Sequence, residues 1–221
     1  MRPAVNPPQL VTLILSTALS VLSLNMFLPS LAHMAVDFET DYALVNLSIA
    51  GYIAISGVLQ IIMGPLSDRY GRRPILLVSL AVFVVASIGC ALAQSIWVFL
   101  GFRLLQGTVV AGQVLSRAVI RDMHSANEAA SKLGYVSMAM ALAPMLGPML
   151  GGVLDMLFGW RASFVLYTVL GVGVLILLWV DLGETNQTPS ATMGQQFRTY
   201  PELFTSRRFW GYSLCAAFSV G

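Results

Sequence analysis

A short charged stretch, residues 64–74, separates two long apolar runs and holds the densest group of charged side chains in the chain. Its sequence is GPLSDRYGRRP, with one acid and three arginines: Asp68, Arg69, Arg72 and Arg73. Near a membrane surface, a carboxylate such as Asp68 can meet the positive end of a neighbouring helix. The stretch therefore predicts a contact with a neighbouring helix. The alternative is a basic turn that only sets the topology.

Glycine and proline in the same stretch predict how its backbone turns. Gly64 and Pro65 can end a helix, and Gly71 allows a tight turn. Pro74 suits the first turn of a following helix. We therefore expect one helix to end near Gly64 and the next to begin at Pro74.

Arg103 is the only charged residue in the middle of an apolar span. A mid-span arginine costs at least about 2.5–3.5 kcal/mol on insertion scales, so it normally faces the bundle interior or a wet cavity and has a partner. Gly107 and Ala111 follow at four-residue steps, which allows another helix to approach that face closely. The alternative is an arginine that extends to the outer surface.

Small residues and prolines form two neighbouring stripes between residues 139 and 152. The small residues recur at four-residue steps: Ala139, Ala143, Gly147 and Gly151. Such a stripe forms a groove for a neighbouring helix. Pro144 and Pro148 lie beside it, and each removes a backbone hydrogen bond. Together with Gly152, they predict a hinge that packs tightly but can rock. Tight packing alone is the alternative.

Three further groups could line a cavity. A polar stripe at four-residue steps comprises Ser48, Tyr52, Ser56 and Gln60. It either lines a water-filled space or bonds to a partner helix. Asn25 is the most polar side chain near the end of the first apolar run and is expected to face inward. Methionine and phenylalanine could provide an adaptable apolar wall, from Met26, Phe27, Met138, Met140 and Met145.

The composition requires a membrane to position these residues. Of the 221 residues, 57% are hydrophobic and only 10% are charged, against roughly 25% in soluble domains. Runs of about 20 apolar residues predict six spanning helices: 9–31, 42–64, 74–93, 96–120, 130–157 and 162–182. The stretch 184–208 is polar and predicts a long surface loop. Residues 209–221 begin a further apolar run, so we expect a piece of a longer chain.

The distribution of positive charge predicts the orientation. Of the 12 Lys and Arg residues, ten fall at one set of span ends: Arg2, Arg69, Arg72, Arg73, Arg117, Arg121, Lys132, Arg198, Arg207 and Arg208. Arginine and lysine favour the cytoplasmic side. The N-terminus and the loops after the second, fourth and sixth spans are therefore expected in the cytoplasm, and no cleavable signal peptide is expected.

Enzyme chemistry finds no support in the sequence. Cys90 and Cys215 both lie in apolar runs and predict neither a disulfide framework nor a metal site. No glycine-rich phosphate loop, metal-ligand cluster or nucleophile–base pair stands out. We interpret His33 and His124 as solvated loop residues. A catalytic activity, a cofactor and a nucleic-acid partner are therefore not expected.

Several of these motifs together resemble the major facilitator superfamily. The stretch 64–73 resembles its loop motif after helix 2, and Arg103-x-x-Gln106-Gly107 is similar to its helix-4 arginine motif. Residues 147–152 (GPMLGG) resemble the antiporter motif of its drug:proton exporters, and residues 25–29 (NMFLP) resemble helix 1 of the bicyclomycin-resistance (Bcr/CflA) group. The chain departs from these patterns at three positions. Asn25 stands where that group often has aspartate, Ala143 replaces a glycine, and Val109 is bulkier than usual.

The resemblance implies an all-α membrane fold, the six-helix N-terminal half of a twelve-helix bundle. Residues 1–182 would form the bundle, 183–208 a cytoplasmic inter-domain loop, and 209–221 the truncated start of helix 7. Asp68 would cap a helix of the missing half in one state. Arg72 would pair with Asp122 at the cytoplasmic end of helix 4.

By resemblance, the protein would export lipophilic drugs of the chloramphenicol or bicyclomycin type across a bacterial inner membrane in exchange for protons. Its cavity would include Asn25, Phe27, Tyr52, Arg103 and Met140, and Arg103 would also couple protons. No carboxylate lies in mid-span. Two alternatives remain: a facilitator for sugars or metabolites, which requires a more polar lining, and a membrane structural or sensor fragment that does not transport.

Overall fold

The computed structural model describes residues 8–186, 205–206, 209–211 and 214–215. Within these residues, six helices are long and apolar enough to cross a membrane: Leu10–Asp37, Tyr42–Tyr70, Arg72–Leu92, Ile96–Met123, Ala126–Phe158 and Arg161–Asp181. They confirm the all-α fold and the six expected spans. Most of the predicted loop 183–208 and of the predicted seventh helix 209–221 lies outside the described residues.

The first span is broken near one end. Helix α1 (Leu10–Asn25) is followed by a short 3₁₀ turn, η1 (Leu28–Ser30), and by α2 (Leu31–Asp37). The expected span ended earlier, at Leu31, and was continuous. Pro29 lies in the first turn of η1 and has no backbone N–H to continue the α-helical ladder, which explains the break.

Helix α3 (Tyr42–Tyr70) corrects the prediction that Gly64 and Pro65 end a helix, because it runs through both of them. It ends at Tyr70, and the next residue, Gly71, has a φ of 100°, a conformation that residues other than glycine rarely adopt. Helix α4 (Arg72–Leu92) follows at once, with Pro74 in its first turn as predicted. The charged stretch is thus mostly helical, with a one-residue turn.

The fourth span also has a local change of winding. Helix α5 (Ile96–Gln106) passes through the 3₁₀ turn η2 (Gly107–Val109) into α6 (Val110–Met123). Helix α7 (Ala126–Phe158) then runs unbroken through Pro144 and Pro148, and α8 (Arg161–Asp181) completes the bundle. Whether the two prolines act as a hinge stays a prediction.

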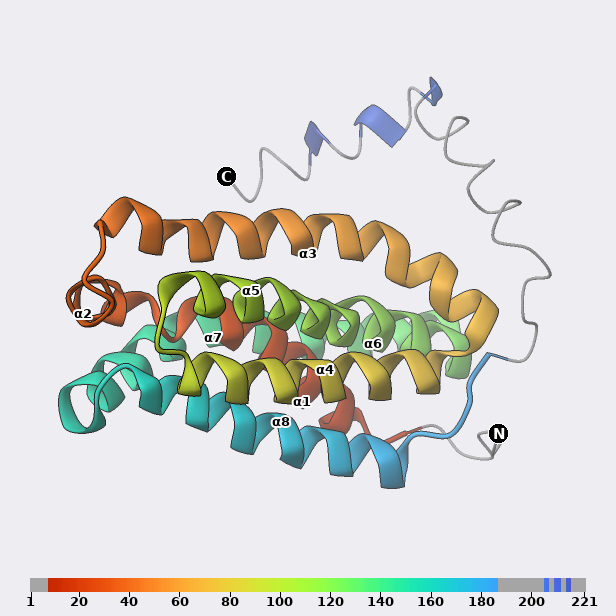
Figure 1. Ribbon diagram of the computed structural model, residues 1–221. Helices are drawn as coiled ribbons and strands as arrows, with labels where there is room; N and C mark the ends of the chain where they lie inside the picture. Colours follow the sequence, from red (N-terminus) through yellow and green to blue (C-terminus); the bar gives the residue numbers. More distant parts are fainter. Residues whose placement is uncertain (1–7, 187–204, 207–208, 212–213, 216–221) are drawn as a thin grey trace.

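Helix α1 is central to the packing, since it contacts α6, α7 and α8, while α3 packs against α5 and α6 and α4 packs against α8 (Figure 1). The predicted small-residue stripe of α7 packs against the end of α1, where the backbone of Met26 lies against Gly147 and Gly151. Figure 1 shows the start of α1, the α3–α4 turn and the end of α8 at the same end of the bundle.

Gly151→Ala is expected to destabilise the protein, because an added Cβ would overlap the carbonyl group of Met26. Overpacking of this kind costs about 1–3 kcal/mol. The midpoint of thermal unfolding in detergent measures the effect. Gly134→Ala is the matched control on the same helix, since nothing lies within 4 Å of its Cβ position. Equal midpoints for the two variants would show that α1 and α7 are not packed this closely.

Candidate functional site

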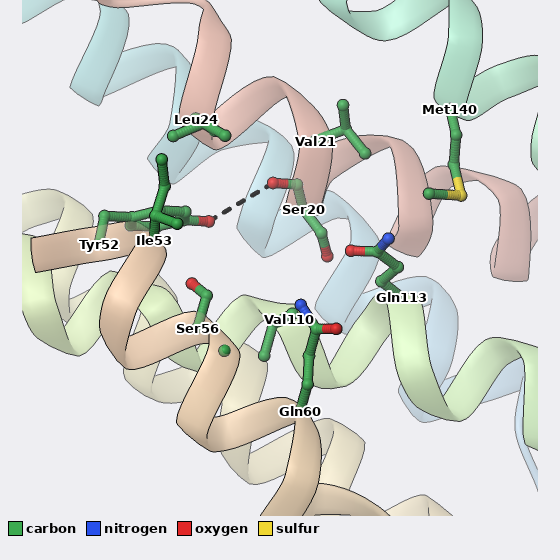
Figure 2. A pocket seen from close by; sticks show the side chains of 11 residues that line it. Ser20, Val21, Leu24, Tyr52, Ile53, Ser56, Gln60, Val110, Gln113 and Met140 are labelled. Atoms are coloured by element: carbon green, nitrogen blue, oxygen red, sulfur yellow. Dashed lines mark hydrogen bonds between the residues drawn. The ribbon is translucent and has the colours of Figure 1, made fainter. Parts of the chain in front are cut away.

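A cavity of about 390 Å³ opens between α1, α3, α6 and α7 (Figure 2). Its lining has a polar part, formed by Ser20, Tyr52, Ser56, Gln60 and Gln113. The apolar part comprises Val21, Leu24, Ile53, Gly57, Val110 and Met140. Three of the four residues of the predicted polar stripe therefore line a cavity, and one of them, Tyr52, also bonds to the partner helix α1, so both interpretations apply to it.

The polar lining is only partly engaged in protein hydrogen bonds. The Tyr52 hydroxyl lies 2.5 Å from Ser23 Oγ, and Ser20 Oγ donates to the carbonyl oxygen of Val109 at 2.6 Å. By contrast, the side chains of Gln60 and Gln113 form no hydrogen bond with another described residue. Figure 2 shows both amides at the border of the hollow. They are available to a bound molecule or to water.

Arg103 lies fully buried behind this cavity, which excludes the alternative of an arginine that extends to the surface. Its Nη1 donates to Gln106 Oε1 at 2.7 Å, and its Nη2 donates to the Ser23 carbonyl oxygen at 2.8 Å. The guanidinium carbon lies 4.2 Å from the centre of the Phe27 ring and 4.3 Å from that of Tyr52. None of the ion pairs in the described part of the chain includes Arg103.

The arginine thus belongs to a network that joins four spans, through α1, α3, α4 and α5. Gln106 Nε2 donates to Ser87 Oγ of α4 at 2.7 Å, and Ser23 of α1 contacts both Arg103 and Tyr52. Buried polar networks fix one arrangement of their helices when their groups are satisfied. Tyr52 is the member that also lines the cavity. A change in the cavity can therefore reach Arg103 through one side chain.

The predicted cavity residues divide into two groups. Tyr52 and Met140 line the cavity. Phe27 and Arg103 are fully buried and do not belong to this lining, while Arg103 borders a second hollow beside Ser48 and Gly51, so their role in a substrate cavity stays a prediction. Asn25 is half-buried, and its Nδ2 donates to the Val21 carbonyl oxygen at 2.8 Å. Its side chain lies against Gly147 of α7 and is not part of the lining.

The expected apolar wall also differs. Met26 is fully buried, whereas Met138 and Met145 are 57% and 69% exposed and lie outside this lining. The sequence reasoning missed Ser20 and Gln113. The seven-residue spacing from Gln106 is no signal for Gln113, because the 3₁₀ turn η2 lies between them and Gln106 bonds instead to Arg103 and to Ser87 of α4.

The charged stretch forms a second cluster at the end of the bundle. Arg72 Nη1 lies 2.5 Å from Asp68 Oδ1, and Arg72 Nε lies 3.2 Å from Asp122 Oδ2. The predicted pair of Arg72 and Asp122 is therefore confirmed. Arg72 also donates to Ser67 Oγ. One guanidinium thus joins the ends of α3, α4 and α6.

The residues that follow α8 complete this cluster, which the sequence did not indicate. The Glu184 carboxylate accepts the backbone N–H groups of Arg72 at 2.9 Å and Arg73 at 3.3 Å. A carboxylate at a helix N-terminus satisfies free N–H groups and meets the positive end of the helix dipole. Asn186 Nδ2 donates to the Asp68 carbonyl oxygen at 2.7 Å. The segment after the sixth span therefore lies on the charged stretch.

Glu184→Ala is expected to lower the stability by about 0.5–2 kcal/mol, the range found when a side-chain helix cap is lost. Glu184→Gln keeps one oxygen acceptor, so its stability should lie between those of Glu184→Ala and the wild type. Glu39→Gln is the control, since Glu39 is exposed. Thermal unfolding would rank the variants. If Glu184→Ala unfolded at the wild-type temperature, the contact with α4 would not contribute to stability.

The interpretation of both histidines as loop residues holds for His124, which lies half-exposed between α6 and α7, but not for His33. His33 lies in α2, and its Nδ1 is 2.6 Å from Oδ2 of Asp155, a carboxylate whose side chain is only 6% exposed. His124 follows the end of α6, with its Nδ1 3.1 Å from the Ile120 carbonyl oxygen. His33 and Asp155 are 122 residues apart, which explains why their pairing was not predicted.

Six membrane-length helices define a polytopic membrane protein, and four of these spans wall a cavity whose lining is uncharged. The family model of the Major Facilitator Superfamily matches residues 13–221. The chain belongs to this superfamily, whose members are transporters rather than enzymes.

Individual relatives and solved structures agree with this assignment. The chain is 35% identical over 208 residues to a chloramphenicol resistance protein of Pseudomonas aeruginosa, covering 92% of this chain and 48% of the relative. It is 29% identical over 206 residues to multidrug resistance protein D of Escherichia coli (strain K12), covering 93% and 52%. The chain thus spans about half the length of the curated relatives it matches.

A crystal structure of the peptide transporter POT in complex with sulfate superimposes with a TM-score of 0.72 at 18% identity. The superposition covers 96% of this chain and 45% of that one. At this identity the likeness concerns the fold alone. It supports the bundle arrangement without indicating a substrate.

Proposed function

We propose that this chain is the first half of a drug exporter of the bicyclomycin-resistance type, located in a bacterial inner membrane with its N-terminus in the cytoplasm. The observation that carries the proposal is the cavity walled by four spans, with Arg103 held directly behind its Tyr52 wall. The relatives named for resistance to chloramphenicol and to multiple drugs support the same substrate class. The bilayer and a second six-helix half would be its structural partners.

Transport would proceed by alternating access, in which two conformers open the cavity to opposite sides. The cluster of Asp68, Arg72 and Asp122 joins three helix ends and would change its contacts with the second half between the conformers. Prolines 144 and 148 would allow α7 to rock. The role of the charged cluster rests on its position at the end of the bundle, and the role of the two prolines rests on their position in the middle of α7.

Exchange for protons would require a group that takes up and releases them. The cavity lining contains no carboxylate. Within the described residues, Asp155 is a buried carboxylate in contact with the exposed imidazole of His33, so it is the candidate proton carrier of this half. The positive charge of Arg103 would favour proton release from a carboxylate that approaches it. The second half of the protein would supply any further carboxylate.

A facilitator for sugars or metabolites is the second candidate. Five of the eleven lining residues are polar, which is more than the expected wall of methionine, phenylalanine and alanine. The two candidates differ in whether a cell becomes resistant or gains a nutrient.

Drug susceptibility distinguishes the candidates. A drug-sensitive strain that expresses the complete transporter should tolerate more chloramphenicol than the same strain carrying an empty vector. Unchanged tolerance to every lipophilic drug, together with uptake of a labelled sugar, would contradict the exporter function and support the facilitator function.

A further inference from the structure

We propose that the cavity selects uncharged substrates that carry hydroxyl or amide groups along one edge, and that Gln60 and Gln113 are the residues that recognise this edge. The inference deepens the proposed export function and rests on it. It specifies a substrate class and the side chains that would distinguish it.

The two amides come from different helices and border the same space. Gln60 is exposed on α3, Gln113 is half-buried on α6, and Figure 2 shows both at the hollow beside Ser20. Neither has a hydrogen bond to another described residue. Each carboxamide offers a donor and an acceptor, so the pair can bind a hydroxyl, an amide or a carbonyl group without a change of protonation.

The remaining wall accepts an apolar body. Val21, Leu24, Ile53, Val110 and Met140 supply it, and the volume of about 390 Å³ lies in the range of small-molecule sites. A ligand that fits both parts has an apolar side and a polar edge. A sugar, which carries hydroxyl groups on every side, would place some of them against the apolar wall without partners.

Charge complementarity disfavours cations. None of the eleven lining residues is charged, so a cation would lose its hydration without gaining a carboxylate from this half of the protein. The guanidinium carbon of Arg103 lies 4.3 Å from the centre of the Tyr52 ring, so a positive charge stands directly behind the wall. A bound cation would therefore be repelled by this half of the protein.

Equilibrium binding to the purified complete transporter tests the proposal with two labelled probes. Chloramphenicol is neutral and carries hydroxyl and amide groups, whereas tetraphenylphosphonium is a lipophilic cation without hydrogen-bonding groups. We expect the wild type to bind chloramphenicol more tightly. Gln60→Leu and Gln113→Leu should each weaken its binding about twofold to tenfold, as expected for one net hydrogen bond.

Two further variants complete the design. Gln94→Leu is the matched control, because Gln94 is exposed and outside the cavity lining. Gln60→Glu should strengthen tetraphenylphosphonium binding by placing a carboxylate in the wall. Thermal unfolding of each variant would confirm that it is folded.

The possible failures are distinguishable. If the wild type bound both probes equally, or if chloramphenicol binding were unchanged in both leucine variants, the specificity inference would be wrong while drug binding stood. If the wild type bound neither probe and conferred no drug tolerance, the inference and the proposed function would both be overturned.

Discussion

Replacing Arg103 by alanine in the complete transporter is expected to leave membrane insertion intact and to reduce drug efflux at least tenfold. Insertion should improve, because a mid-span arginine costs at least about 2.5–3.5 kcal/mol. Efflux should fall, because the variant removes the donors to Ser23 and Gln106 and the cation beneath the Tyr52 ring. Hydrogen bonds to charged groups contribute about 1.5–3 kcal/mol each, so two of them exceed the energy of a tenfold change.

The efflux rate of Arg103→Lys should lie between those of Arg103→Ala and the wild type. Lysine keeps the charge but lacks the planar fork that reaches two acceptors in fixed directions. Arg121→Ala is the control, since Arg121 is exposed on the same span. Expression level and initial efflux rate would be measured together for all variants. A well-expressed Arg103→Ala protein with wild-type efflux would mean that the buried network is structural filling only.

The second large effect is expected for Asp68→Asn, which should insert normally and transport slowly. Asparagine keeps an oxygen near Arg72 but loses the charge that pairs with it at 2.5 Å. In the proposed contact, Asp68 would meet the N-terminus of a helix of the second half, where an anion contributes about 0.3–1 kcal/mol, and up to ~2 kcal/mol when partly buried. Because the side chain of Asp68 is 34% exposed, a value near 1 kcal/mol, or about fivefold in conformer ratio, is the expected size.

The rate of efflux at saturating drug would measure this effect, with Glu39→Gln as a neutralisation control on an exposed residue. Asp122 should still hold Arg72 in the variant, so folding is expected to survive. Transport at the wild-type rate would identify the charged stretch as a topology signal without a conformational role.

The spans were predictable because each is a continuous apolar run, and hydropathy reports such runs directly. Their local geometry was less predictable. Gly71 was recognised as a turn, yet α3 runs past Pro65, since packing against α5 and α6 supports a helix that the local signals would end. The 3₁₀ turn after Gln106 has no clear composition signal.

The site was predicted in type but not in arrangement. A mid-span arginine indicates a buried partner, but periodicity does not say that the partner is the Ser23 carbonyl, 80 residues away. The same limit applies to Glu184 and Arg72, which are 112 residues apart. Phe27 was assigned to the cavity because of its type, whereas its burial depends on its place between α1 and η1 and on contacts with Phe164 of α8 and Arg103 of α5.

The central claim is that this cavity carries drugs across the membrane and that Arg103 serves that transport. Its most direct test is accumulation of labelled chloramphenicol in proteoliposomes of the complete transporter under an imposed proton gradient. We predict gradient-dependent accumulation by the wild type, reduced accumulation by Gln113→Leu, and accumulation at least tenfold lower by Arg103→Ala. Accumulation that does not depend on the proton gradient, or that is equal in the wild type and Arg103→Ala, would contradict the account.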